Sequence, residues 1–240
     1  MWEGRIPLSS VTWTYDPKKH FWFPPSFEER RLQIWYSMLS HYPHLYDGEI
    51  LVLDHFFLEK GILRLSTRSV RFSKILVHMK DNLKFPKYGS LGFQAIVTDP
   101  THSYLLIGKR SHFSEYKPGY HTIPGGMFEK SDINNSLIDA CLRELTEEIS
   151  IDINPKSFYL IAMLLEANHL GTCLLVEVET KEKLSSSNNH ESKILGNEEW
   201  ENNQLEWILF SQICDLDQKR ILEGLDFLRM RLIKQKGSFE

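Results

Sequence analysis

Three glutamates on one helical turn constrain this chain more than any other feature. In residues 138–149 aliphatic side chains recur at helical spacing, which predicts one apolar stripe made of Ile138, Leu142, Leu145 and Ile149. Glu144, Glu147 and Glu148 fall on the opposite side at relative positions i, i+3 and i+4, so their carboxylates are neighbours. Such a cluster repels itself unless it is solvated or holds a hard cation. Mg²⁺ fits best, because it takes oxygen ligands from a few carboxylates and from substrate phosphates. A solvated acidic face is the simpler alternative.

The residues around the cluster favour the cation. Pro124-Gly125-Gly126 precedes the helix, and Arg143 lies directly before the first glutamate. Residues 125–151 resemble the signature of the Nudix hydrolase superfamily. That signature is a Gly, five residues, a Glu, seven residues, then Arg-Glu-aliphatic-any-Glu-Glu-any-Gly-aliphatic. Its second half is present in residues 143–151, with Ser150 where the family has Gly.

The first half of the signature departs from the family pattern. Asp132 lies at the family's distance after Gly126, whereas Asn135 lies at the family's distance before Arg143. The loop is therefore three residues longer, and the first signature Glu is missing. Asp132 or Glu129 is available to replace it, or nothing does. The half that binds metal in the family is intact, so the resemblance implies that the chemistry survives.

For the fold, the resemblance implies an α/β architecture of the Nudix α/β/α sandwich type, with a mixed sheet between helices. Residues 89–240 are expected to form the Nudix hydrolase domain, and residues 1–88 an N-terminal extension packed on it. Short pieces of the extension resemble a smaller branch of the family that includes hydrolases of nucleotide sugars such as UDP-glucose. These pieces are Ile34-Trp35, Leu45-Tyr46-Asp47 and Leu63-Arg64-Leu65-Ser66.

For function, the resemblance implies a pyrophosphohydrolase of a nucleoside diphosphate linked to a moiety X, with a nucleotide sugar favoured. Mg²⁺ is the expected cofactor, with Mn²⁺ as an alternative. Glu144 and Glu148 are expected to bind the metal most directly, while Glu147 binds it too or orients the attacking water. Arg143 is expected to pair with one of the carboxylates or with a backbone carbonyl and so to orient the cluster.

Four residues are candidates for holding the diphosphate. Gly125 and Gly126 allow positive φ and close backbone approach, so that backbone N–H groups can face a pyrophosphate oxygen. Arg110 ends a predicted strand and has the fork geometry for a bidentate contact with phosphate, although a solvated loop end fits equally well. His121 stands where many Nudix proteins have Trp. It is able to carry a proton near neutral pH, but a histidine that packs or hydrogen-bonds is the more common case.

Two other functional classes stay open. In the first, the altered signature marks a non-catalytic Nudix-fold domain that binds a nucleotide or a protein. The missing Glu and Ser150 support this class, whereas Arg143 and the three glutamates oppose it. In the second, the enzyme hydrolyses capped or dinucleoside polyphosphates. The basic residues needed to grip a long polyphosphate are not concentrated in any segment.

Composition limits the partners and the compartment. Apolar residues make up 42% of the chain and charged residues 25%, which is typical of a soluble globular protein. The net charge of −4 gives no general attraction to nucleic acid or to an anionic membrane. Three cysteines without paired spacing argue against a disulfide framework or a zinc site. With no signal peptide pattern and no membrane-spanning run, we expect a cytoplasmic protein.

The remaining segments predict a mixed α/β order. The first 28 residues are rich in aromatic side chains and are expected to pack on the core as surface or edge strands, with base stacking or a homodimer interface as alternatives. Strands are expected over 50–57, 61–67, 92–98, 104–107, 158–166, 172–179 and 205–210. Helices are expected over 26–39, capped by Ser26 and with Leu32, Trp35, Met38 and Leu39 on the buried face, and over 217–233. The signature helix is expected to be capped by Asn134 or Asn135. The polar segment 181–201 carries Glu191, Glu198, Glu199 and Glu201, and Nudix enzymes often take their general base from a loop in this region.

Overall fold

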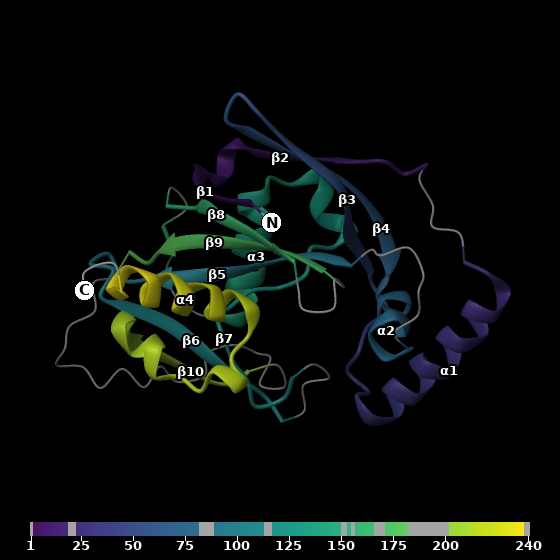
Figure 1. Ribbon diagram of the computed structural model, residues 1–240. Helices are drawn as coiled ribbons and strands as arrows, with labels where there is room; N and C mark the ends of the chain where they lie inside the picture. Colours follow the sequence, from purple (N-terminus) through teal and green to yellow (C-terminus); the bar gives the residue numbers. More distant parts are fainter. Residues whose placement is uncertain are drawn as a thin grey trace.

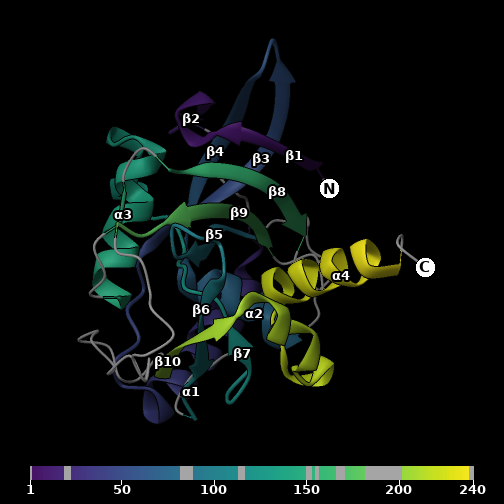
Figure 2. The same ribbon diagram turned by 90° about the vertical axis from the view of Figure 1, so that its left-hand side faces the viewer.

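The computed structural model describes residues 2–18, 23–81, 89–112, 117–149, 153–154, 157–165, 171–181 and 202–237. In this part of the chain a mixed sheet lies between helices (Figures 1 and 2). The strands are β1 (Trp2–Pro7), β2 (Val11–Tyr15), β3 (Glu49–Glu59), β4 (Ile62–Arg71), β5 (Ser90–Thr98), β6 (Tyr104–Arg110), β7 (His121–Thr122), β8 (Tyr159–Leu165), β9 (Gly171–Glu179) and β10 (Asn202–Leu209). The α-helices are α1 (Pro25–His41), α2 (Phe72–Asp81), α3 (Leu137–Glu148) and α4 (Glu223–Gly237). Short 3₁₀ segments are η1 (Leu8–Ser10), η2 (Lys130–Asn134), η3 (Phe210–Asp215) and η4 (Gln218–Arg220).

Alternating side chains of the central strand β5 explain the layers. Phe93, Ala95 and Val97 belong to the buried cluster that includes the apolar residues of α3. Ile96 points to the other face and belongs to the cluster that includes the apolar residues of α4. Figure 2 shows α3 and α4 on opposite sides of the sheet. The predicted α/β/α sandwich with a mixed sheet is therefore confirmed.

The sheet runs in the order β1-β8-β9-β5-β3-β4-β2, and β6 joins β5 to β7 and β10. The pairs β5/β9 and β2/β4 are parallel, and the other pairs are antiparallel. β1 and β2 stand at the two ends of this order, which confirms that the first residues form edge strands. The strands of the extension thus belong to the same sheet as the signature region. The predicted boundary at residue 88 falls outside the described residues, so the division into two parts stays a prediction.

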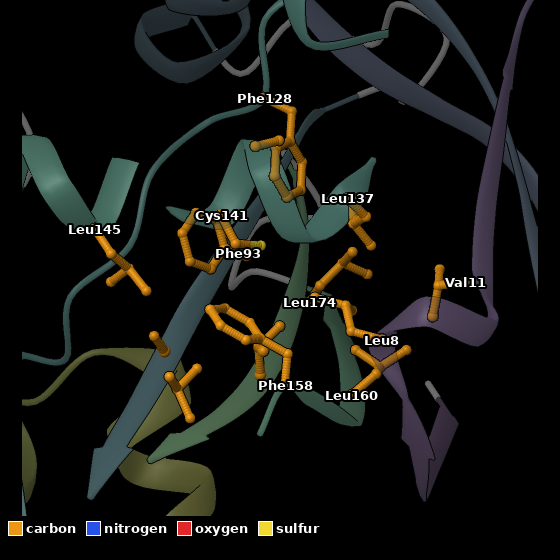
Figure 3. Close-up of a cluster of buried hydrophobic side chains, with 14 of the residues drawn as sticks. Leu8, Val11, Phe93, Phe128, Leu137, Cys141, Leu145, Phe158, Leu160 and Leu174 are labelled. Atoms are coloured by element: carbon orange, nitrogen blue, oxygen red, sulfur yellow. The ribbon is translucent and has the colours of Figure 1, made fainter. Parts of the chain in front are cut away.

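The core on the α3 side joins segments far apart in the chain. Figure 3 shows Phe93 and Phe128 near Cys141 of α3, with Leu8 and Val11 approaching from the N-terminal segment. These side chains are at most 5% exposed. Burial of this kind contributes about 25 cal/mol for each Å² of apolar surface removed from water. The N-terminal segment therefore helps to fix the signature helix on the sheet.

Helix α1 differs from its prediction at the N-terminus and in its buried face. It begins at Pro25 after the N-cap residue Pro24, and no side chain caps it, so the predicted Ser26 cap is wrong. A proline in the first helical turn lacks only an N–H that has no partner inside the helix. The expected core residue Leu32 is 40% exposed. The buried positions are Phe27, Ile34, Trp35 and Met38.

The last helix starts later than predicted. Asp217 caps the short segment η4 by accepting the N–H of Lys219, and α4 begins only at Glu223. The N–H of Gly224 donates to Gln94 Oε1 of β5 at 2.9 Å. A Cβ at Gly224 would lie 2.1 Å from that oxygen, so a larger residue would displace the end of the Gln94 side chain and break this hydrogen bond. None of the described helices is long and apolar enough to cross a membrane.

Candidate functional site

The signature helix α3 is capped by Ser136. Ser136 Oγ accepts the N–H of Asp139 at 3.1 Å, and Asp139 Oδ2 accepts the N–H of Ser136 at 3.3 Å. This reciprocal pair is a capping box. The predicted caps Asn134 and Asn135 are wrong, because the N–H of Asn135 donates to the carbonyl of Asp132 and closes η2 instead.

The buried face of α3 follows the predicted period but not the predicted phase along its whole length. Leu145 and Ile149 are buried as expected. Ile138 and Leu142 are only partly buried and pack against the edge of the cluster. The core positions in the first half of the helix are Leu137, Ala140 and Cys141.

Arg143 contacts three carboxylates at once. Its Nε and Nη2 donate to Asp132 Oδ1 and Oδ2 at 3.2 and 3.0 Å. Nη2 also lies 2.6 Å from Glu144 Oε1, and Nη1 lies 3.2 Å from Glu147 Oε2. Asp132, Glu144 and Glu147 hold the pKa of this guanidinium well above its usual range. The expected pairing of Arg143 with a carboxylate is thus present, and it extends over three acidic side chains.

Of the two residues available to replace the missing first signature Glu, Asp132 and Glu129, it is Asp132 that contacts the signature helix. The three extra loop residues coil into η2, and the Asp132 side chain turns inward to the guanidinium of Arg143. Its exposure is 1%, and it also accepts the N–H of Glu129 at 2.8 Å. Glu129 instead pairs its backbone with Ile50 of β3 and accepts a hydrogen bond from Ser131. The sequence signal for Asp132 was its distance after Gly126.

The two glycines allow close approach rather than an unusual backbone conformation. A Cβ at Gly125 would lie 2.1 Å from the carbonyl oxygen of Phe93, and a Cβ at Gly126 would lie 2.0 Å from Glu144 Oε2. Among the described glycines, positive φ occurs at Gly61 and Gly119, so the expectation of positive φ at Gly125 and Gly126 is wrong. The N–H of Gly125 donates to Glu148 Oε2 at 2.8 Å. That contact ties the end of α3 to the loop that precedes it.

The carboxylates of this site outnumber its positive charges. Burial, together with the charges of Glu147 and Asp132, raises the pKa of Glu144 to about 7 against the opposing effect of Arg143. Only 16% of the Glu144 side chain is exposed. Arg143 contacts three of the four acidic side chains, and Glu148 accepts the N–H of Gly125 instead. A divalent cation would relieve this imbalance.

The donor set therefore fits a hard metal ion, but its members are turned toward other partners. Glu144, Glu147 and Glu148 supply only carboxylate oxygens, which Mg²⁺ and Mn²⁺ accept. Within the described residues, no three His, Cys, Asp or Glu side chains already surround one position for a metal ion. Glu144 and Glu147 face Arg143, and Glu148 faces the Gly125 amide. Ser150, the departure at the end of the signature, lies outside the described residues.

Arg110 and His121 lie on a different part of the sheet. Arg110 ends β6, where its N–H donates to the carbonyl of Tyr120 at 2.9 Å. His121 on β7 pairs with Lys109, and its carbonyl accepts the N–H of Leu222. Nδ1 of His121 is buried without a hydrogen-bond partner among the described residues.

The surroundings of His121 come from the α4 side of the molecule. Burial and the charge of Lys109 lower its pKa, while Glu206 of β10 and Asp217 next to η4 oppose that shift. None of the signature glutamates is among these groups. The ring is therefore neutral at pH 7. The glutamates expected in a base-bearing loop, Glu191, Glu198, Glu199 and Glu201, lie outside the described residues.

Solved structures similar to this one include several bacterial and archaeal proteins. A MutT protein from a study of Aliivibrio salmonicida and Vibrio cholerae is 20% identical, with a TM-score of 0.43, over 61% of this chain and 98% of that chain. The MutT protein of Methanosarcina mazei is 16% identical, with a TM-score of 0.42, over 64% and 98% of the two chains. A Nudix hydrolase of Nitrosomonas europaea is 17% identical, with a TM-score of 0.42, over 62% and 89%.

The sequence itself carries the stronger comparison. No curated protein matches this chain in sequence. The family model of the NUDIX domain, however, matches residues 90–224, which is more than half of the chain. The matched region holds the glycine loop, η2 and the whole of α3. The chain therefore belongs to the Nudix family and is a hydrolase that acts on phosphorus-containing anhydrides.

Proposed function

We propose that the protein is a Mg²⁺-dependent pyrophosphohydrolase of a nucleoside diphosphate linked to a moiety X, with a nucleotide sugar as the favoured substrate. Membership of the Nudix family implies pyrophosphohydrolysis of nucleoside diphosphate derivatives. The observation that carries the proposal is the Arg143 fork, which gathers Asp132, Glu144 and Glu147 at the end of α3. Beside it, Glu148 is bound to the glycine loop.

Glu144, Glu147 and Glu148 are the residues that would hold the metal ion. When bound, Mg²⁺ neutralises diphosphate charge and lowers the pKa of a coordinated water. The protein's own contribution is positional. Arg143 keeps two mutually repelling carboxylates side by side, and the Gly125 amide fixes the third. Because Glu144 has a pKa near 7, a change in local charge determines whether its carboxylate holds a proton.

The glycine loop places the backbone next to this cluster. The N–H of Phe93 donates to the carbonyl of Gly126, and the N–H of Ala95 donates to the carbonyl of Pro124. The loop is thus paired with β5 and has a defined position relative to α3. We propose that the diphosphate lies along this loop, and that Arg110 and His121 contribute to substrate binding from the neighbouring β6/β7 hairpin.

Preference for a nucleotide sugar rests on the resemblance of the extension. Ile34 and Trp35 are buried on α1, and residues 63–66 lie on β4 between β2 and β3. Asp47 precedes β3 and accepts the N–H and the hydroxyl of Ser73 at 2.8 and 3.0 Å. These residues form the frame of the extension. The preference for a nucleotide sugar comes from the sequence resemblance of these residues to the nucleotide-sugar branch of the family.

The test is a substrate panel with matched variants. Wild type, E148Q and the control E29Q are incubated with Mg²⁺ and UDP-glucose, ADP-ribose, NADH or a dinucleoside polyphosphate, and the phosphate products are measured. Glu29 is exposed on α1, so E29Q removes one charge far from the cluster. We expect UDP-glucose or a related nucleotide sugar to be cleaved by wild type and E29Q, with a loss of at least about 100-fold in E148Q.

Two outcomes would overturn parts of the proposal. Cleavage of dinucleoside polyphosphates alone would replace the nucleotide sugar as substrate. Binding of a nucleotide without turnover of any panel member would indicate a Nudix-fold binding domain. A metal titration by calorimetry tests the metal site separately, because tight Mg²⁺ binding that E148Q weakens shows that the carboxylate cluster holds the ion whichever substrate is cleaved.

A further inference from the structure

Among the described residues, the far end of the β3/β4 hairpin has no partner along one edge of β3. On the side away from β4, β3 pairs with Glu129 at Ile50 and with Ser90 at Val52. Beyond that point no described segment pairs with the open side of β3, although β4 follows the strand on the other side to Glu59. Figures 1 and 2 show this hairpin extending past the rest of the sheet.

Apolar side chains gather on this open segment. Phe56, Phe57 and Leu58 are 40%, 47% and 47% exposed, and Ile62 on β4 is 40% exposed. An unpaired strand presents a row of free N–H and C=O groups, and natural proteins normally cover such an edge or block it with charge. Three consecutive exposed apolar residues do the opposite. They favour pairing with another strand.

The sequence of the segment is complementary to itself. In an antiparallel pair centred on Phe57, residue 57 of one copy faces residue 57 of the other, and Phe56 faces Leu58. His55 then faces Glu59 at both ends of the pair. The apolar residues meet in the middle, and polar partners of matching character meet at the ends.

The limits of the segment follow from its neighbours. Asp54 is bound to Arg68 and lies at the register shift between Leu53 and His55, so it does not belong to the regular edge. Lys60 has a positive φ of 51° and lies in the turn. The regular open edge is therefore residues 55–59, which is the self-complementary part.

We propose that two copies of this chain pair edge to edge through residues 55–59 of β3, antiparallel across a two-fold axis at Phe57. A two-fold axis requires the same patch to be complementary to itself, and this segment meets that requirement. Backbone hydrogen bonds between the two edges supply the pairing, and the side chains fix its register. The result is a sheet continuous between the two copies.

Charge reversal tests the register. H55E places a carboxylate opposite Glu59 twice in each dimer, and E59K places an ammonium opposite His55 twice. The double variant H55E/E59K places a carboxylate opposite an ammonium at both ends of the pair. By sedimentation equilibrium we expect a wild-type dimer, a dissociation constant at least about 10-fold weaker in H55E because like charges directly opposite are destabilising, and recovery in the double variant.

A cysteine at the axis gives a second, independent readout. In an antiparallel pair the directly opposite Cα atoms are about 4.5 to 5.5 Å apart, within reach of a disulfide. F57C is therefore expected to form a disulfide-linked dimer on mild oxidation. L58C is the matched control, because residue 58 faces residue 56 and its own copy is too far away. Wild type, with Cys141 and Cys173 buried and Cys214 half-buried, measures the background.

The result that would overturn the proposal is a wild-type chain that stays monomeric at tens of micromolar. A dimer that H55E leaves intact, or that cross-links equally through F57C and L58C, would overturn it as well. Hydrolysis per chain is expected to be the same in wild type and H55E, because His55 lies outside the carboxylate site. Failure of this interface is thus distinguishable from failure of the proposed function.

Discussion

The two halves of the signature region differ in how well they match the family pattern and in the contacts that hold them. The loop half, residues 125–136, departs from the family pattern but is tied to its surroundings by Asp132, by the pairing of Pro124 and Gly126 with β5, and by Lys130, whose Nζ lies 2.6 Å from Glu49 Oε2. The helix-end half, residues 143–148, matches the family pattern. It nevertheless holds several carboxylates around one guanidinium.

This contrast separates chemistry from support. The residues that match the family signature lie where negative charge is concentrated, and that concentration lowers the stability of the fold until a cation is bound. The residues that differ from the signature lie in the loop, where hydrogen bonds and ion pairs hold the loop on the sheet. Several sequences can make such contacts. We therefore expect substitutions at the helix end to act mainly on metal binding. Substitutions in the loop half should act mainly on stability, except at Gly126, where an added side chain meets Glu144 of the helix end.

The largest effect is expected for G125A. Its added methyl meets the backbone of Phe93 and Gln94 in β5, which cannot move without breaking the hydrogen bonds between β5 and the glycine loop. We expect a loss of about 3 kcal/mol in the free energy of unfolding, measured with urea. The matched variant G126A meets only the carboxylate end of Glu144, which is flexible. G126A should keep most of the stability of the fold and weaken Mg²⁺ binding. Equal losses of stability in G125A and G126A would contradict this difference between the two glycines.

The next effect concerns Asp132, which is buried beneath Arg143. D132A leaves the guanidinium with Glu144 and Glu147 as its carboxylate partners and removes the side chain that accepts the Glu129 N–H. We expect a loss of about 2 to 3 kcal/mol, reduced from the cost of breaking a fully buried pair because Arg143 is 36% exposed. E129A is the control, since the sequence allowed either residue. A larger loss of unfolding free energy in E129A than in D132A would show that Glu129, and not Asp132, stabilises the loop.

A smaller, pH-dependent effect is expected at the helix end. The pKa of Glu144 is raised from 4.5 to about 7, so in metal-free protein the folded state keeps a proton that the unfolded state releases in this interval. Stability from this group therefore falls as pH rises from about 5 to 7. Relative to E144Q, wild type in EDTA should lose about 2 kcal/mol between pH 5 and pH 8.

Saturating Mg²⁺ should remove that difference, because a bound cation stabilises the ionised carboxylate. E29Q, with its charge removed on α1, should follow the wild-type curve at every pH. Parallel curves for wild type and E144Q in EDTA would show that Glu144 titrates normally in the folded protein.

Much of the fold could be predicted from local patterns. The alternating side chains of β5 and the pairing of β3 with β4 are indicated by residues close together in the sequence, and the structure contains both. Choices between equivalent local solutions could not be predicted. Ser136 and Asn135 are both good N-caps, and burial of Leu137 and Ala140 selects the former.

The site shows the same division. The positions of Glu144, Glu147 and Glu148 followed from helical spacing, and their contacts with Arg143 and Gly125 confirm that they share one region. The role of Asp132 depended on how the three extra residues coil, and a count along a loop does not determine that. The parallel pairing of β2 with β4 is equally non-local, because its two strands are about 50 residues apart.

The smallest effect is expected where that non-local strand meets the loop. Trp13 of β2 donates its Nε1–H to the carbonyl of Asn135 at 3.2 Å, and its ring packs edge-on against Phe128 at 5.3 Å between centroids. W13F keeps an aromatic ring but removes the donor, so we expect a loss of about 1 kcal/mol in the free energy of unfolding.

W2F is the control, because Trp2 packs on the same cluster and its indole has no hydrogen bond in the described part of the chain. If the Trp13 hydrogen bond supports the loop, W13F should lose more stability than W2F and leave the Mg²⁺ affinity unchanged, because the carboxylates are held separately by Arg143 and Gly125. Equal losses would mean that β2 stabilises the region through apolar packing alone, and a weakened Mg²⁺ affinity in W13F would show that loop support and metal binding are one property rather than two.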